Sequence, residues 1–177
     1  MRPTRVLAAV LLAQALAVAT AALSETYRDA RTGLVIHYPR GWRLDNSYPG
    51  FEIVDFPPSK RPPQVLVPAD HADIGIFSPP EGENTVAEWM GKERVGESQG
   101  YRVTELALGT KHIGTLRVTK AVNHPSGIPG ATLLLYFFDV DGRPIKAALF
   151  YRGQGRGAEF EGVVNSIIAA LEPISSH

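Results

Sequence analysis

The sequence predicts an α+β fold, an antiparallel β-sheet flanked by helices. Strand-like segments come first, one helix interrupts them, further strands follow and a helix closes the chain. This order lacks the regular βαβ alternation that a parallel sheet requires. In addition, Asp141-Gly142 separates two apolar strand candidates by a tight turn, which joins antiparallel neighbours.

The first strand is predicted at residues 34–38, where Leu34, Ile36 and Tyr38 alternate onto one face. Further strands are predicted at 51–56 and 72–77. The prolines of Phe56-Pro57-Pro58-Ser59-Lys60-Arg61-Pro62-Pro63 fix φ and remove backbone donors. We therefore expect an extended surface loop between these two strands.

The first helix is predicted to begin at Thr85. Thr85-Val86-Ala87-Glu88 is a capping-box pattern, in which the threonine hydroxyl and the glutamate carboxylate each bind a backbone N–H. Trp89 and Met90 then lie on one side of the helix with Val86. We expect Trp89 and Trp42 to be core residues, because large aromatic side chains dominate small cores.

Three or four strands are predicted in the second half of the chain, over residues 101–108, 114–122, 131–139 and 144–151. Residues 132–138 are almost continuously apolar, as expected of a central strand that is covered on both faces. The last helix has apolar residues at i, i+3, i+4, i+7, i+8 and i+11, so it packs flat on the sheet. These residues are Phe160, Val163, Val164, Ile167, Ile168 and Leu171.

The N-terminal residues have the pattern of a secretory signal peptide. Arg2 and Arg5 precede an apolar run over 6–18, and Ala19-Thr20-Ala21 supplies the small residues of a cleavage site. The apolar run is shorter than the ~20 residues of a transmembrane helix. We expect cleavage after Ala21, which leaves residues 22–177 as a single exported domain.

The amino-acid composition excludes several kinds of site and partner. The chain has no cysteine, which excludes disulfides, thiolate metal sites and a lipidated cysteine. Loss of two of the 18 basic residues with the signal peptide, against 18 acidic ones, gives a formal net charge of −2. This charge favours neither nucleic acid nor an anionic membrane. A soluble protein of the bacterial periplasm, or an extracellular one, fits best.

Several of these segments together resemble the PsbP-like family. They are the run Gly33-Leu34-Val35-Ile36-His37-Tyr38-Pro39-Arg40-Gly41-Trp42, the strand at 72–74, the Thr85-capped helix with Trp89, and the helix that contains Glu159-Phe160-Glu161. The resemblance covers roughly residues 25–172. It implies a PsbP-like α/β/α sandwich, the fold shared by an extrinsic photosystem II subunit, a Ran-binding nuclear import factor and many bacterial exported proteins. It implies no catalytic residues. Cyanobacterial members typically carry a lipidated cysteine, which this chain lacks.

Two small-ligand sites are conceivable from the sequence. Gly153, Gly155 and Gly157 lie between a strand and a helix, where backbone N–H groups can bind an anion. The alternative is a simple strand-to-helix connection. His71 and Asp73 share a face if 72–77 is a strand, and with Asp70 nearby they offer metal ligands. The alternative is a polar turn that enters the strand, and we expect no cofactor.

A nucleophilic site is the weakest of these hypotheses. Ser126 lies two residues after His124, but neighbours in sequence need not point at each other, and no Gly-x-Ser-x-Gly elbow is present. We therefore predict no catalytic residue and rank a hydrolase last.

The sequence is most consistent with a noncatalytic binding or assembly module. Its predicted functional surface is the proline-rich segment from Asp55 to Pro68, because irregular loops on a rigid scaffold commonly carry binding. Lys60 and Arg61 are the candidate contacts to a protein partner in the cell envelope. The alternatives are an inert extended loop, or a periplasmic small-ligand or metal-ion carrier that uses His71 and Asp73.

Overall fold

The structure is a computed structural model that describes residues 23–46, 51–60, 67–82, 84–93, 97–98, 101–102, 107–125, 127–153 and 155–175. Its elements follow the predicted order of strands, helix, strands and helix, except that a strand at Leu23–Asp29 precedes the first predicted strand and a two-residue strand at Glu172–Pro173 follows the last helix. In chain order they are β1 (Leu23–Asp29), β2 (Leu34–Pro39), β3 (Arg43–Asp45), β4 (Glu52–Val54), the 3₁₀-helix η1 (Pro58–Lys60), β5 (Ala72–Phe77), α2 (Val86–Glu93), β6 (Glu97–Ser98), β7 (Tyr101–Arg102), β8 (Ala107–Ile113), β9 (Leu116–Asn123), β10 (Ala131–Val140), β11 (Arg143–Arg152), α3 (Gly157–Ala169) and β12 (Glu172–Pro173).

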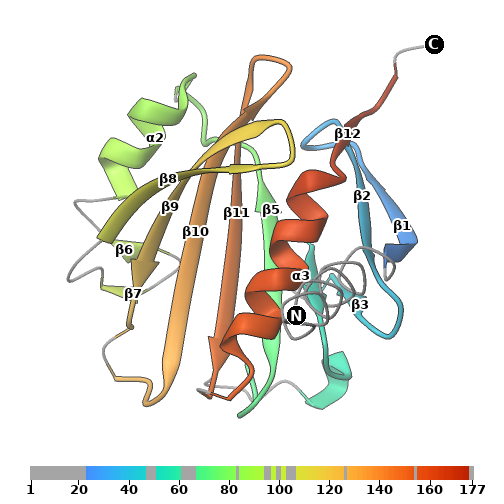
Figure 1. Ribbon diagram of the computed structural model, residues 1–177, viewed down its shortest axis with the longest axis vertical. Coiled ribbons are helices and arrows are strands. Elements are labelled where there is room, and N and C mark those ends of the chain that lie inside the picture. The colour runs from blue at the N-terminus through green and yellow to red at the C-terminus, as the bar shows by residue number, and fades with distance from the viewer. Residues whose placement is uncertain are drawn as a thin grey trace, which may run out of the picture.

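A seven-stranded antiparallel sheet forms the centre of the molecule, in the order β3-β4-β5-β11-β10-β9-β8 (Figure 1). β10 and β11 pair along their whole length, from Ala131 opposite Arg152 to Val140 opposite Arg143. Asp141 and Gly142 join them with φ of 51° and 75°. Positive φ at both positions is what a two-residue type I′ hairpin requires, so the predicted tight turn is confirmed.

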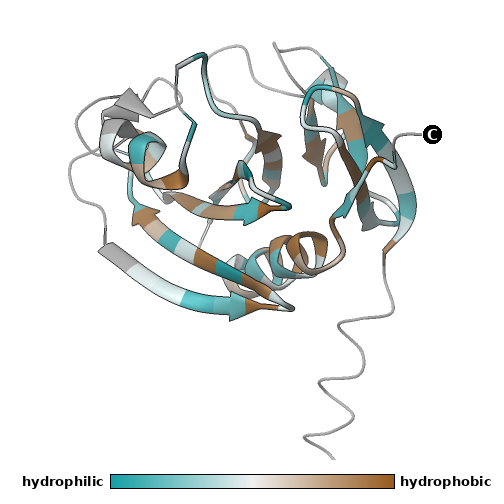
Figure 2. Ribbon diagram, turned by 90° about the horizontal axis from the view of Figure 1, so that it is seen from above, coloured by the Kyte–Doolittle hydropathy of each residue, from teal (hydrophilic) through white to brown (hydrophobic). Residues whose placement is uncertain are grey.

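A second, three-stranded sheet has the order β1-β2-β12 and lies beside α3 (Figure 2). Together α3 and this sheet cover one face of the seven-stranded sheet, while α2 covers the other. The core accordingly has two parts. Ile74 and Ile76 of β5 belong to the cluster under α3, and Phe137 of β10 belongs to the cluster under Trp89 of α2. The α+β class with an antiparallel sheet flanked by helices is confirmed.

Both predicted helices have the expected buried faces. In α3, Phe160, Val164, Ile167 and Ile168 are fully buried. In α2, Trp89 is 3% exposed, and its ring meets the sheet edge-to-face. The capping box is formed as well: the backbone N–H of Glu88 donates to Thr85 Oγ1 at 3.2 Å, and that of Thr85 donates to Glu88 Oε2 at 3.1 Å.

Two strand boundaries in the second half were predicted incorrectly. The predicted strand over 101–108 contains β7 (Tyr101–Arg102) and the first residues of β8 (Ala107–Ile113), which belong to different sheets, and Gly114 lies in the turn after β8 rather than opening the next strand. Gly114 has φ of 57°, which suits the first position of a two-residue hairpin turn. Ile113 is thereby placed opposite Leu116.

The predicted signal peptide at residues 1–21 lies outside the described residues. Within the part that the structure describes, no helix combines the length and the apolar character needed to cross a membrane.

Candidate functional site

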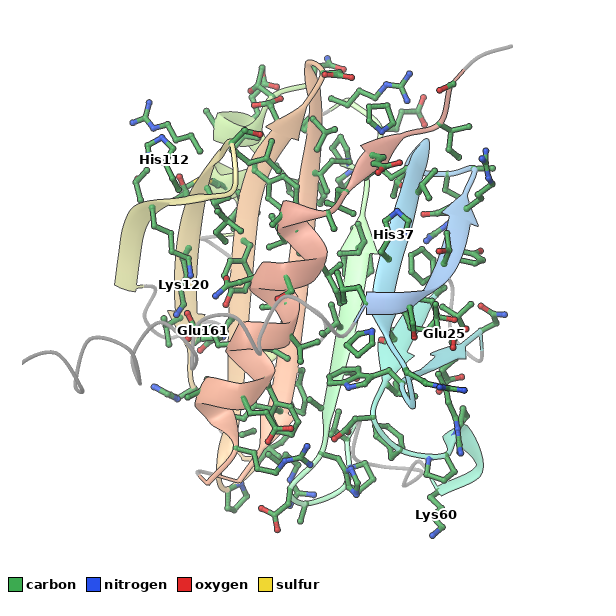
Figure 3. All side chains as sticks on the ribbon, turned by 45° about the vertical axis from the view of Figure 1, so that its right-hand side comes forward. Glu25, His37, Lys60, His112, Lys120 and Glu161 are labelled. Atoms are coloured by element: carbon green, nitrogen blue, oxygen red, sulfur yellow. The ribbon has the colours of Figure 1, made fainter. Side chains whose placement is uncertain are left out.

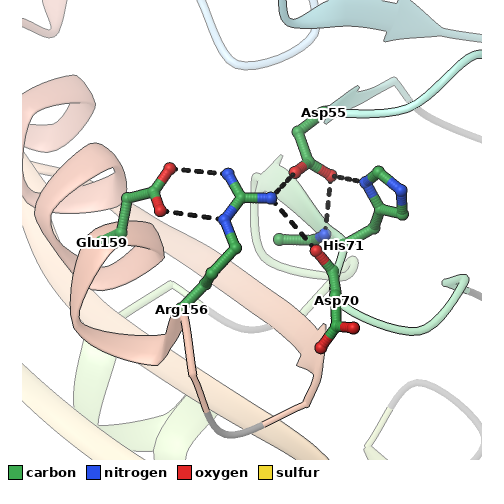
Figure 4. A network of polar contacts seen from close by, with 6 residues as sticks. Asp55, Asp70, His71, Arg156 and Glu159 are labelled. Carbon is green, nitrogen blue, oxygen red and sulfur yellow. Dashed lines mark hydrogen bonds and ion pairs between the residues drawn. The ribbon is translucent and has the colours of Figure 1, made fainter.

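One end of the seven-stranded sheet carries a polar network that links segments far apart in the sequence (Figure 4). Asp55 is its centre. It follows β4, and its side chain is only 7% exposed. The Asp55 carboxylate accepts hydrogen bonds from the backbone N–H of Ala72 at 2.8 Å and from Arg156 Nη1 at 3.2 Å. His71 Nδ1 lies 3.1 Å from the same carboxylate. A buried carboxylate needs such partners, because an uncompensated buried charge is costly.

Arg156 brings the amino-terminal end of α3 into the network. Its Nε and Nη2 donate to the two carboxylate oxygens of Glu159 at 2.9 and 2.6 Å. Its Nη1 donates to Asp55 and, at 3.1 Å, to the carbonyl oxygen of Asp70. The guanidinium also lies 4.5 Å from the centre of the Phe160 ring. The charge is therefore shared between one exposed and one buried carboxylate.

The ionisation of these groups follows from the pairing. The hydrogen bond to Glu159 is the main reason that the pKa of Arg156 is raised, with a smaller contribution from Asp55. The same hydrogen bond from Arg156 holds the pKa of Glu159 below its usual value. Both groups are thus charged at neutral pH, and the guanidinium of Arg156 is already engaged by carboxylates of its own chain.

Backbone contacts connect the network to β11. The N–H of Asp70 donates to the carbonyl of Arg152 at 3.0 Å, and the N–H of Arg152 donates to that of His71 at 3.2 Å. Asp70 has φ of 60°, and Gly153 has φ of 94°. A Cβ atom at Gly153 would collide with the carboxylate of Asp70, so only glycine fits where the two turns meet.

The predicted anion site, at Gly153, Gly155 and Gly157, lies where these two turns meet. Gly153 contacts Asp70, Gly155 has no neighbour around the position of a Cβ, and Gly157 packs closely on the ring of Tyr151. α3 begins at Gly157, and the carboxylate of Glu159 lies in its first turn. The two carboxylates bound to Arg156 thus occupy the surroundings in which an external anion was expected. Anion binding by the three glycines stays a prediction.

The predicted metal ligands occupy different environments: His71 directly precedes β5, and Asp73 lies within it. His71 is 37% exposed, stacks edge-to-face on Phe56 and pairs with Asp55, while Asp73 is 5% exposed within the sheet. Side chains alternate between the two faces along a strand, and Ala72 and Ile74 belong to the core cluster under α3. His71 and Asp73 therefore face the other side of the sheet. Among the described residues, no three His, Cys, Asp or Glu side chains come together in a way that could hold a metal ion.

The proline-rich segment begins and ends at this network. Phe56 and Val67, near its two ends, are 2% and 0% exposed and belong to the same core cluster. The carbonyl of Val67 accepts a hydrogen bond from Arg152 Nη1 at 3.3 Å. Between them, Lys60 ends η1 and projects outward from the body of the molecule (Figure 3). The other predicted contact, Arg61, lies outside the described residues, as does Ser126.

Sequence reasoning gave no role to three members of the network: Arg156, Glu159, and Asp55, which it named only as the first residue of the proline-rich segment. Arg156 and Glu159 had a detectable signal, because opposite charges three residues apart at a helix start commonly pair. Asp55 had none, since its partners lie 16, 17 and 101 residues away.

Comparisons with known proteins find similarity in structure alone. Models of protein families give no match to the chain, and no curated protein matches its sequence. A crystal structure from Bacteroides thetaiotaomicron is 14% identical with a TM-score of 0.53; the match covers 87% of this chain but only 50% of that one. The solution structure of cyanobacterial PsbP from Synechocystis is 16% identical with a TM-score of 0.51, and the match covers 86% of this chain and 93% of that one. The chain has a PsbP-like fold, as the sequence resemblance implied.

Proposed function

We propose that this chain, through its PsbP-like fold, acts as an exported, noncatalytic binding or assembly module, and that the segment Asp55–Pro68 is its partner-binding surface. The observation that carries the proposal is the role of Asp55. One buried carboxylate, at the start of the segment, binds the backbone N–H of Ala72, the first residue of the strand that follows the segment, and Arg156 of the helical layer.

Such an anchor favours binding because it reduces the conformational entropy that the loop loses when a partner binds. Ordering a loop at an interface costs free energy, and fixing its ends beforehand lowers that cost. Phe56 and Val67 supply two buried fixed points, and Lys60 lies exposed between them. Loops held on a rigid scaffold are the usual location of binding residues.

The charge of the segment suggests the chemistry of its partner. Lys60 and Arg61 are adjacent cations, with prolines on both sides and no acidic residue from Phe56 to Ala69. A protein surface of the cell envelope that carries acidic side chains would complement them. The pair should therefore affect the rate of association and its salt dependence more than the stability of the fold.

The test combines site-specific crosslinking with a charge-matched control. A photoactivatable residue at position 60 is used in cells to identify the crosslinked protein by mass spectrometry, and affinity for that purified protein is then measured. K60S/R61S should weaken binding at least tenfold. The control R28S/R117S removes the same charge from exposed positions on β1 and β9 and should change binding less than twofold. Equal binding by K60S/R61S and the parent protein would rule out this surface.

Export is tested separately. Intact-mass measurement of the protein from the periplasmic fraction should give a chain that begins at Ala22. A species that retains residues 1–21 in the membrane fraction would contradict the secretory part of the proposal.

A further inference from the structure

A pocket of about 450 Å³ lies at the end of the seven-stranded sheet opposite the Asp55 network. Three connections form its walls: the β1–β2 turn, the residues that follow β5, and the β10–β11 hairpin, the first and last of which lie at the top of Figure 1. Since β11 runs between the two ends over ten residues, about 3.3 Å each, the pocket lies roughly 30 Å from the network. An inference drawn here is independent of the proposed function.

The charged side chains that line the pocket are positive among the described residues. Arg31 and Arg143 line it, and no acidic side chain does among the described residues. The other polar groups on its wall include the hydroxyl of Ser78 and the side chain of Asn84. Ser78 Oγ donates to the carbonyl oxygen of Arg31 at 3.3 Å, which ties the wall after β5 to the β1–β2 turn.

The side chain of Arg31 is oriented by contacts with Asp29 and Phe51. Its Nε and Nη2 lie 3.3 and 3.4 Å from the carboxylate of Asp29, which is 2% exposed and also accepts a hydrogen bond from Thr32 Oγ1 at 2.9 Å. The Arg31 guanidinium further lies 5.4 Å from the centre of the Phe51 ring. The side chain is nonetheless 49% exposed, so a buried carboxylate and an aromatic ring orient a guanidinium that still faces solvent.

Arg143 supplies a second guanidinium, which has no carboxylate partner among the described residues. It is the first residue of β11, and no described residue forms an ion pair or hydrogen bond with its side chain. Its Nη1 lies directly against Gly33, where any Cβ atom would collide with it. Gly33 also has φ of 70°. The β1–β2 turn therefore leaves the space that Arg143 fills at the pocket wall.

We propose that this pocket binds the oxyanion of a small ligand, a carboxylate or a phosphate, between Arg31 and Arg143. A planar guanidinium presents paired N–H donors that match either group, and it stays charged at all physiological pH values. The volume lies within the range of small-molecule sites, about 300–1,000 Å³. Asp29 neutralises one of the two cations, so the second is the charge that an incoming anion compensates.

The experiment follows backbone amide signals of the purified protein by NMR during titration with inorganic phosphate and, separately, with succinate, at constant ionic strength. We expect saturable shifts at Gly33 and Gly142 with at least one of the two anions. Saturation with succinate alone indicates a carboxylate ligand, saturation with phosphate alone a phosphate ester, and saturation with both an oxyanion site of general character.

Matched variants test whether the anion that causes these shifts binds in the pocket. R143Q should raise the dissociation constant at least tenfold, and N84D, which puts a negative charge on the wall, should do the same. R117Q removes an equally exposed arginine from β9 and should change it less than twofold. The proposal fails if neither anion gives saturable shifts below 10 mM, if R143Q and N84D bind as the parent protein does, or if R117Q weakens binding equally.

Discussion

Asp55 and Arg156, 101 residues apart in the chain, meet through Oδ2 and Nη1 at 3.2 Å. The contact connects the end of β4 with the beginning of α3. Asp55 is almost fully buried, whereas Arg156 is 41% exposed and has a second carboxylate partner. Removing Asp55 therefore affects more than one ion pair, because the backbone N–H of Ala72 loses its acceptor as well.

We expect D55A to lower the free energy of unfolding by about 2 kcal/mol, since it leaves a buried backbone donor unpaired and breaks a partly buried ion pair. E159Q is the matched control, because it changes the exposed carboxylate on the same guanidinium and should cost less than about 1 kcal/mol. Urea denaturation compares the two. Equal losses in both variants would show that Asp55 has no special role.

The same variants report on the anchoring of the proline-rich segment. Lys60 is exposed and precedes Arg61, so trypsin can cleave the bond between them. Under native conditions, D55A should be cleaved there several-fold faster than the parent protein and E159Q. An unchanged rate in D55A would mean that Asp55 does not hold the ends of the segment.

Ile167→Ala should destabilise the protein by ~2–5 kcal/mol, because Ile167 is fully buried between α3 and the sheet and truncation leaves a cavity. The loss is a large part of the ~5–15 kcal/mol expected of a small domain. The denaturation midpoint measures it. A variant that melts like the parent protein would contradict the packing of α3 on the core.

Gly162→Ala should have the opposite effect. Gly162 is exposed in the middle of α3, and nothing lies within 4 Å of where its Cβ would stand. Alanine is favoured over glycine in a helix interior by roughly 0.5–1 kcal/mol, so the melting temperature should rise. A decrease would indicate a contact on the outer face of α3.

The pH dependence of stability tests the contacts of Glu161. Burial alone would raise its pKa, but hydrogen bonds and charge from Lys120 and Lys111, at 2.6 and 3.3 Å, lower it below the ordinary 4.5. The labelled side chains of Lys120 and Glu161 lie together in Figure 3. Because the folded state binds its proton less readily than the unfolded state, Glu161 stabilises the fold above about pH 4.5 and loses this contribution as pH falls through the lowered pKa.

E161Q should therefore be less stable than the parent protein by about 1 kcal/mol at pH 7, and the difference should vanish at pH values below the folded pKa. Chemical denaturation at a series of pH values measures it. E81Q, which changes an exposed loop carboxylate, is the control and should show no such convergence. A difference between E161Q and the parent that persists at pH 2 would point to packing rather than charge.

Calorimetry tests the metal hypothesis. We expect no submicromolar binding of zinc or manganese to the purified protein, because His71 is paired with Asp55 and Asp73 is buried within the sheet. Submicromolar binding that is lost in H71A/D73A would establish the site that the sequence suggested.

The elements with strong local patterns could be predicted from the sequence. Residues 72–77 and the β10–β11 hairpin were predicted within one residue of their observed bounds, because alternating or continuous apolar runs end at turn residues. The apolar stripe of α3 was predicted because its large side chains share the helical period, although Leu171, the sixth residue of the predicted pattern, lies beyond the end of α3. The capping box at Thr85 was predicted because its two hydrogen bonds are local.

Elements that depend on distant partners could not be predicted. β12 consists of two residues, and its pairing with β2 brings Glu172 opposite Val35. No local pattern marks such a strand. The pocket at Arg31 and Arg143 was missed for the same reason, since its lining comes from three separate connections. Single residues in the sequence carry no information on which connections meet.

Asp55 holds the two ends of the proline-rich region together through its contacts with Ala72. This makes the region a suitable site for grafting a foreign peptide. The chain leaves β4 and enters β5 at adjacent points, where Asp55 and Ala72 exchange two hydrogen bonds. We therefore expect that residues 61–66 can be replaced without a change in the register of these two strands. Doubling the length of a flexible loop costs only about 0.6 kcal/mol in closure entropy. An epitope or sensor sequence inserted there would be displayed on a scaffold whose other end, with Arg31 and Arg143, is left unchanged.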